Sequence, residues 1–258
     1  MTKLRKILTA TIATLMIFTL AACGSDDSSS SSKDTTNKTE ITTAPNDESN
    51  QATNATTAKM EDLKENPESD FQYKEKDGNI TLIKYIGKSV NVVIPKKIDN
   101  MPVTVIGFDY VNGKVTACFE NSSIESVFIP DTVTSMNNYA FAKCENLTSV
   151  TLSNNLTVIN SFAFYNCPKL NNIAIPDSVT KIQDRAFCEC TNLKSVNIPE
   201  KVTSIGKSAF KNCTSLTSMT IPESVKTIEN SAFAGCDNLK DITYPEWVKV
   251  ADKERINK

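Results

Sequence analysis

Apolar residues recur every 23 positions along the second half of the chain, with polar residues at fixed places between them. One unit contains Leu193, Val196, Ile198-Pro199, Val202, Ile205, Ala209-Phe210 and Cys213. The most regular columns are Phe141, Phe164, Phe187, Phe210 and Phe233, and Cys144, Cys167, Cys190, Cys213 and Cys236. A unit of this length is too small to bury its own apolar side, so successive units must stack and share one core. The period therefore predicts a repeat solenoid.

Each unit is predicted to contain one short parallel strand and one tight turn. Val196 and Ile198 alternate with polar residues, as in a half-buried strand, and Pro199 ends the strand because it has no N–H to donate. The Ala-Phe pair is expected to lie in a helical or 3-10 turn that buries the ring. Parallel strands lie about 4.8 Å apart, so each column of like residues forms a continuous row in the core.

Residues 67–258 are expected to form the solenoid, with a terminal unit of different composition at each end. Near the start, Asp77-Gly78 predicts the turn of a β-hairpin. The stretch Phe108–Thr116 is longer than the period allows and is expected to bulge as a loop. The predicted parts are an N-terminal cap (67–95), an irregular repeat (96–123), regular repeats (124–243) and a C-terminal cap (244–258).

The start of the chain predicts export and lipid attachment. Residues 1–22 combine a basic beginning with a short apolar run, which is typical of a secretory signal peptide and too short to span a bilayer comfortably. Leu20-Ala21-Ala22-Cys23 resembles the bacterial lipobox, in which the cysteine sulfur receives a diacylglycerol before cleavage. The mature protein is then held in a membrane through lipidated Cys23. The alternative is an ordinary cleavage site followed by an incidental cysteine.

Residues 23–66 are predicted to be a disordered tether. They are rich in Ser, Thr and Asn, and they contain almost no large apolar side chains that could offset the entropy of ordering the chain. The tether carries an excess of acidic residues, whereas the solenoid is close to neutral. Neither part has the basic patch of a nucleic-acid-binding protein, and no nucleic acid is expected as a partner.

Several kinds of catalytic and metal site are excluded by composition. The chain has no histidine, so it cannot form a Ser-His-Asp or Cys-His pair or a zinc site that uses histidine. None of its seven glycines lies in a dinucleotide-binding fingerprint. The cysteine column is expected to fill a core groove with small buried side chains. Cys188 lies outside that column and is expected to be partly exposed. No catalytic residue, cofactor or metal is predicted.

The repeat pattern Ile-Pro-x-x-Val-x-x-Ile-x-x-x-Ala-Phe-x-x-Cys-x-x-Leu-x-x-Val resembles the BspA-like class of bacterial leucine-rich repeats. The resemblance covers about residues 71–258 and departs from the pattern at Leu152-Ser153 and Met219. It implies a leucine-rich repeat solenoid. Because members are commonly extracellular or surface-attached, and some act as adhesins, it also implies a location at the cell surface and a possible role in adhesion.

Outward-facing strand residues are the predicted binding surface. They are small and nearly uncharged, and two aromatic residues add candidate hot spots. The predicted binding residues are Phe128, Tyr110, Ser149, Thr151, Asn172, Ser195, Asn197, Ser218 and Thr220. The sequence thus predicts a non-enzymatic surface lipoprotein that binds an extracellular or host protein, or a glycan. The alternatives are a structural envelope protein without a specific ligand and an accessory subunit of a glycan-processing system.

Overall fold

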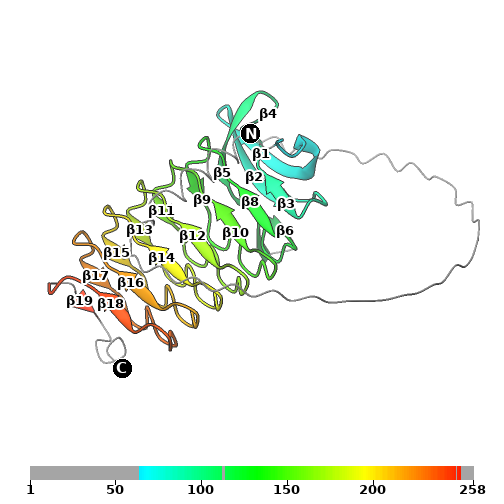
Figure 1. The fold of residues 1–258 in the computed structure, drawn as a ribbon. Coiled ribbons are helices and arrows are strands. Elements are labelled where there is room, and N and C mark those ends of the chain that lie inside the picture. The colour runs from blue at the N-terminus through cyan, green and yellow to red at the C-terminus, as the bar shows by residue number, and fades with distance from the viewer. Residues whose placement is uncertain (1–63, 112–113, 248, 251–258) are drawn as a thin grey trace, which may run out of the picture.

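Two rows of short parallel strands run along the molecule (Figure 1). The structure is a computed structural model and describes residues 64–111, 114–247 and 249–250. The first row consists of β3 (Asn91–Val93), β8 (Ser126–Phe128), β10 (Ser149–Thr151), β12 (Asn172–Ala174), β14 (Ser195–Asn197), β16 (Ser218–Thr220) and β18 (Asp241–Thr243). The second row consists of β5 (Met101–Ile106), β9 (Ser135–Met136), β11 (Val158–Ile159), β13 (Lys181–Ile182), β15 (Ser204–Ile205), β17 (Thr227–Ile228) and β19 (Lys249–Val250).

Strand pairing follows the sequence period. In the regular turns, each strand residue pairs with the residue 23 positions away, as Val150 does with Val127 and Ile173 with Val196. The same register holds in the second row, where Ile182 pairs with Ile205. Equivalent side chains of successive turns therefore stack on one another in the core, and the predicted solenoid is confirmed.

The third side of each turn is built from tight turns instead of the expected helical segment. The only helix among the described residues is the 3-10 segment η1 (Glu68–Asp70) near the start. In a typical turn, Arg185 and Glu189 have φ values of 53° and 66°, and this left-handed backbone prevents a helix from continuing. The Phe187 N–H instead donates to the Ala209 carbonyl of the next turn at 2.8 Å. This third ladder of hydrogen bonds joins the turns.

The phenylalanine column is a continuous stack of buried rings. From Phe141 to Phe233, successive ring centroids lie 5.3–5.6 Å apart and the ring planes differ by 3–9°. The stack extends toward the N-terminus through Phe119 and Tyr85 to Phe71, so the cap continues the same column. Each interior ring contacts one ring on either face, and the loss of a single ring affects two neighbouring turns.

The cysteine column fills the groove beside the rings and also supplies hydrogen bonds. In each regular turn, the Sγ donates to the carbonyl oxygen of a phenylalanine of the preceding turn at 2.9–3.2 Å; this residue lies 25 positions earlier for Cys144 and 26 positions earlier for the others. The thiol thus links adjacent turns and satisfies a buried acceptor. All seven cysteines in the described part of the chain are free and buried, so the prediction of small core residues is confirmed.

The N-terminal hairpin was predicted correctly. Strands β1 (Phe71–Lys76) and β2 (Asn79–Tyr85) pair antiparallel around Asp77 and Gly78, whose φ values of 51° and 72° are those of a type I′ turn. Strand β2 continues into the solenoid by pairing parallel with β5. Because Ile80 and Leu82 are fully buried, this hairpin closes the first end of the core.

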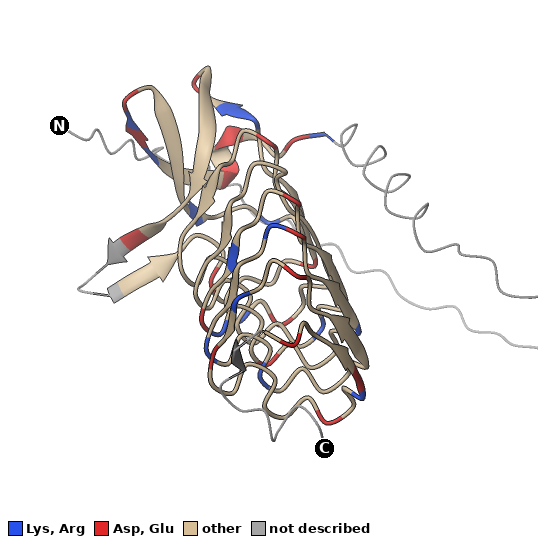
Figure 2. Ribbon diagram, turned by 90° about the vertical axis from the view of Figure 1, so that its left-hand side faces the viewer, with Lys and Arg blue, Asp and Glu red and all other residues tan. Residues whose placement is uncertain are grey.

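The irregular repeat contains a second hairpin where a loop was expected. Strands β6 (Phe108–Val111) and β7 (Lys114–Ala117) pair antiparallel, and the short β4 (Lys97–Ile98) pairs with β5. Val92 and Val127 still pair in register although they are 35 positions apart, so the additional chain is accommodated outside the stack. In Figure 2 the hairpin projects from one side of the solenoid and the first strand row lies on the other. Charges of both signs are interspersed along the turns.

Part of the predicted tether contacts the solenoid. Asn66 donates its N–H to Val93 O at 2.9 Å and accepts the Val93 N–H at 2.8 Å, so it lies against the edge of β3. Glu65 accepts the Lys96 N–H at 3.2 Å. The signal peptide (1–22), Cys23 and the tether up to residue 63 lie outside the described residues. Within the described residues, no helix has the length and apolar character needed to cross a membrane.

Candidate recognition surfaces

The first strand row presents a face of small polar side chains. In each strand the central residue points into the core and the residues beside it point outward. As predicted, the outward residues Ser149, Asn172, Ser195, Asn197, Ser218 and Thr220 are exposed, and Thr151 is half-buried. Ser195 Oγ lies 3.4 Å from Asn172 Oδ1, and Ser126 Oγ donates to Asn91 Oδ1 at 2.6 Å. Part of the hydrogen-bonding capacity is therefore used along the rows.

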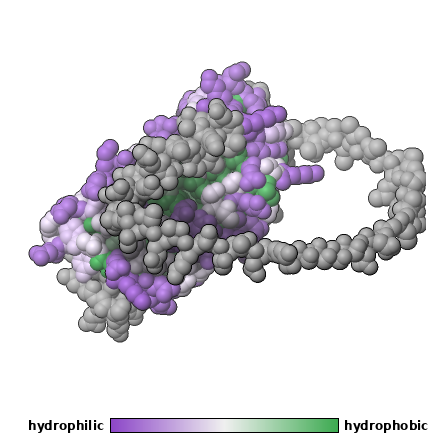
Figure 3. Space-filling view, viewed as in Figure 1, coloured by the Kyte–Doolittle hydropathy of each residue, from purple (hydrophilic) through white to green (hydrophobic). Residues whose placement is uncertain are grey.

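Phe128 is not the exposed aromatic residue that the sequence predicted. Only 9% of it is accessible, and it is flanked in register by Val93 of β3 and Thr151 of β10. Figure 3 views this face and shows polar residues at its margins, with apolar residues toward the middle between the atoms drawn in grey. Without Phe128 as an anchor, the face offers mainly hydroxyl and amide groups.

Tyr110, the other predicted hot spot, lies on the projecting hairpin. Its backbone belongs to β6, but its side chain lies outside the described part of the structure. Its predicted role stays a prediction. Phe108, at the start of the same strand, is half-buried and lines a cavity at the base of the hairpin.

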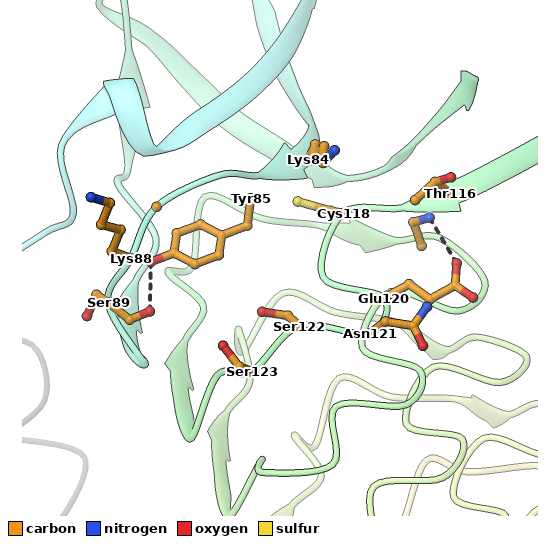
Figure 4. Close-up of a pocket in the computed structure, with 12 residues that line it drawn as sticks. Lys84, Tyr85, Lys88, Ser89, Thr116, Cys118, Glu120, Asn121, Ser122 and Ser123 are labelled. Carbon is orange, nitrogen blue, oxygen red and sulfur yellow. Dashed lines mark hydrogen bonds between the residues drawn. The ribbon is translucent and has the colours of Figure 1, made fainter. Parts of the chain in front are cut away.

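One cavity lies where the N-terminal cap meets the first turns, with a volume of about 340 Å³ (Figure 4). It is lined by backbone and polar side chains, including Lys84, Lys88, Ser122 and Ser123. The Tyr85 side chain extends along the cavity, and its hydroxyl donates to Ser89 O at 2.8 Å. Both lysines are exposed at its rim. The cavity provides hydroxyls and cations but no apolar anchor.

A second cavity, of about 490 Å³, lies at the base of the β6–β7 hairpin. We call it the hairpin cavity. Its lining residues are Phe108, Val115, Glu120, Asn137, Asn138, Tyr139 and Asn160. Val115 and Tyr139 are 49% and 38% exposed, which is unusual for large apolar side chains. It therefore combines aromatic and aliphatic surface with three amides and one carboxylate, the mixture typical of small-molecule sites.

A group of surface aromatics extends from the hairpin cavity along the third side of the solenoid. The Tyr139 ring stacks on Phe162 with centroids 4.5 Å apart and planes 12° apart. Phe162 also meets the edge of Tyr165 at 5.8 Å, and the Arg185 guanidinium lies 5.2 Å from its centroid. The sequence analysis missed this group. The sequence feature that could have predicted it is the pair Tyr139 and Phe162, which are aromatic at a repeat position that the later turns fill with Arg185, Ser208 and Ser231.

Neither cavity has the groups of a hydrolytic site. Among the described residues, Glu120 is the only carboxylate that lines either one, and glycosidases of the usual kind need two. Its Oε2 accepts the Ala117 N–H at 3.4 Å. In the described part of the chain, no group of three His, Cys, Asp or Glu residues is arranged to hold a metal ion. The described lining of the two cavities provides hydroxyl, amide and aromatic groups that can bind a ligand.

The repeat and the fold both occur in known proteins. The family model for the BspA type leucine rich repeat region matches residues 115–240 in six copies. A leucine-rich repeat protein of T. pallidum is 31% identical in sequence, with a TM-score of 0.67, and the match covers 72% of this chain and 86% of that one. This chain belongs to the BspA-type leucine-rich repeat family. Membership indicates a binding or surface role.

A second solved structure supports the fold of this leucine-rich repeat protein. A leucine-rich repeat protein from Bacteroides ovatus is 20% identical, with a TM-score of 0.51, and the match covers 73% of this chain and 55% of that one. At this identity the likeness concerns the fold alone. The comparison with curated proteins finds no match.

Three of the buried thiols, those of Cys144, Cys188 and Cys190, have raised pKa values. Cys188, predicted to be partly exposed, is only 4% accessible, so that prediction is wrong. Burial raises the pKa of the Cys188 thiol to about 11, and it raises the pKa values of Cys144 and Cys190 to about 12. A nucleophilic cysteine needs a lowered pKa and access, and these three lack both.

Proposed function

We propose that this leucine-rich repeat protein is an exported lipoprotein that binds a protein or glycan at the bacterial cell surface and catalyses no reaction. Lipidated Cys23 anchors it, and residues 24–63 hold the solenoid away from the membrane. The observation that carries the proposal is an exposed aromatic and amide surface on a rigid stack with a fully packed core. Exposed aromatic residues are the usual anchors of recognition sites.

The structural arguments against catalysis support the same proposal. The described lining of the two cavities includes a single carboxylate, the described cysteines are buried, and the chain has no histidine. Amides, hydroxyls and aromatic rings remain, and these bind ligands without reacting. A solenoid also presents them on a surface that changes little on binding.

Anchoring is tested by replacing the lipidated cysteine. Cells that express the full chain and are fed a radiolabelled fatty acid should label it, and the protein should sediment with membranes. The Cys23→Ser variant should incorporate no label and should lose membrane association, because serine cannot accept the diacylglycerol. Labelling that persists in the variant, or membrane association without any label, would contradict the proposed anchor.

Recognition is tested on the surface of the same cells. Cells that display the full chain should bind at least one member of a panel of fluorescent extracellular-matrix proteins and glycans, and binding should saturate. Cells without the protein are the control. Uniform absence of saturable binding from correctly displayed protein would instead support a structural envelope role. Turnover of a glycan would support the glycan-processing alternative.

A further inference from the structure

The hairpin cavity has hydrogen-bonding groups that the protein itself does not use. Within the described part of the chain, the side-chain amides of Asn137, Asn138 and Asn160 make no hydrogen bond, and neither does the Tyr139 hydroxyl. Asn138 and Tyr139 are exposed, whereas Asn137 and Asn160 are half-buried in the wall. Three amides from two adjacent turns therefore supply donors and acceptors around one hollow.

Tyr139 and Phe162 are held in a backbone conformation that disfavours them. Their φ values are 63° and 59°, in the left-handed region where bulky side chains are rare and asparagine is tolerated. The equivalent Ser208 and Ser231, with φ values of 55° and 59°, carry small polar side chains. Two adjacent turns thus keep aromatic rings at positions where a smaller residue suits the backbone better. The left-handed conformation itself recurs in every turn, as at Arg185 with a φ of 53°, so the aromatic rings are what distinguish these two turns.

The aromatic group holds the Tyr139 ring rigidly. Phe162 covers one face of that ring at 4.5 Å and is itself held by Arg185 on the next turn. Tyr139 also lines the hairpin cavity together with Phe108 and Val115, so the face of the ring that Phe162 does not cover is the one left for a ligand. A ring positioned before binding costs little conformational entropy when a ligand arrives.

The chemistry of these groups matches a sugar. A pyranose presents an apolar face of C–H bonds, which stacks on the electron-rich face of an aromatic ring, and a rim of hydroxyls, which pair with amides and carboxylates. Among the described residues that line the hairpin cavity there is no lysine or arginine, which favours a neutral ligand over a phosphate or an acidic peptide. Its volume of about 490 Å³ lies within the range of small-ligand sites.

We propose that the hairpin cavity binds a glycan, with one sugar ring stacked on Tyr139 and its hydroxyls bonded to Asn137, Asn138 and Asn160. Glu120 accepts a further hydroxyl, and Phe108 and Val115 cover the opposite side. This inference rests on the proposed function and specifies both its ligand class and its site. The first strand row then serves as scaffold.

The deciding variant is Tyr139→Asn, assayed as the full chain in detergent micelles on a glycan array. Asparagine suits the left-handed backbone, so the urea midpoint should stay equal to that of the wild type or rise. Glycan binding should fall at least tenfold because the stacking face is gone. Ser231→Asn introduces the same residue at the same column position four turns away, and it should leave binding unchanged.

Each remaining outcome separates the site from the broader function. Glycan binding that survives Tyr139→Asn but is lost in Ser195→Arg/Asn197→Arg would place the site on the first strand row, overturning this inference and leaving the proposed function intact. Saturable binding to matrix proteins without binding to any glycan on the array would contradict the glycan as ligand and leave the proposed function intact. If folded wild-type protein binds neither glycans nor matrix proteins, both the proposed function and the proposed glycan site are contradicted.

Discussion

Phe187→Ala is expected to lower the free energy of unfolding by about 3–5 kcal/mol, the usual cost of removing a large buried ring. Phe187 is fully buried and lies between Phe164 and Phe210, with centroid separations of 5.4 and 5.3 Å. Alanine would leave a cavity that the flanking turns cannot close, because three hydrogen-bonded ladders fix their spacing. Urea denaturation of the full chain, followed by circular dichroism, measures the loss.

The matched comparison is Phe233→Ala, which removes the same side chain near the C-terminal end of the column. Among the described residues, Phe233 stacks on Phe210 alone, and its side chain is 4% accessible. Its loss is expected to cost clearly less than that of Phe187 and to fray the last turns before the rest unfolds. Equal costs, or a cost below about 1 kcal/mol for Phe187→Ala, would contradict a continuous shared column.

Alkaline pH is expected to destabilise the protein steeply. Burial raises the pKa values of Cys144 and Cys190 to about 12, from an ordinary value of 9.0. Below pH 9 both the folded and the unfolded states hold these protons. Between pH 9 and about 12 only the folded state holds them, so stability falls as the pH rises. The slope is about 1.4 kcal/mol per pH unit for each thiol, or about 3 kcal/mol per unit for this pair.

Urea midpoints between pH 7 and 11 check this dependence, and Cys190→Ala is the matched variant. At pH 7 the variant is less stable, since it loses the Sγ hydrogen bond to Phe164 O as well as buried volume. Above pH 9 its stability should fall less steeply, by about 1.4 kcal/mol per pH unit, because one titrating thiol is gone. Parallel curves for wild type and variant across pH 9–11 would show that Cys190 is not buried.

The regular turns were predictable because their information is local and repeated. The apolar positions from Leu193 to Cys213 recur in the turns on either side, so one period determines strand, core and stacking together. The hairpin at Asp77-Gly78 was equally predictable from the sequence, because that dipeptide favours left-handed backbone. The Asn112-Gly113 dipeptide between β6 and β7 is a comparable hairpin signal. A loop was predicted there because the segment is longer than the repeat period allows.

The recognition surface was harder to predict, because it depends on contacts between residues without a shared pattern. Phe128 occupies an outward position, yet Val93 and Thr151 flank it, and Val93 belongs to a strand 35 positions earlier. Tyr139 and Phe162 are aromatic at a column position that later turns fill with polar residues, but only the stacked geometry brings their rings together. Asn160 joins Asn137 at the same cavity because one full turn separates them.

Glycan recognition at the hairpin cavity is tested most directly by hydrogen exchange of the full chain, with and without a glycan probe taken from the array. With saturating probe, amides of residues 137–140 and of β6 should exchange more slowly, because the ligand covers the hairpin cavity and holds the hairpin against the turn. Amides of β12, β14 and β16 should exchange unchanged. Slower exchange confined to those strands, or no protection anywhere at saturation, would contradict recognition through the hairpin side of the solenoid.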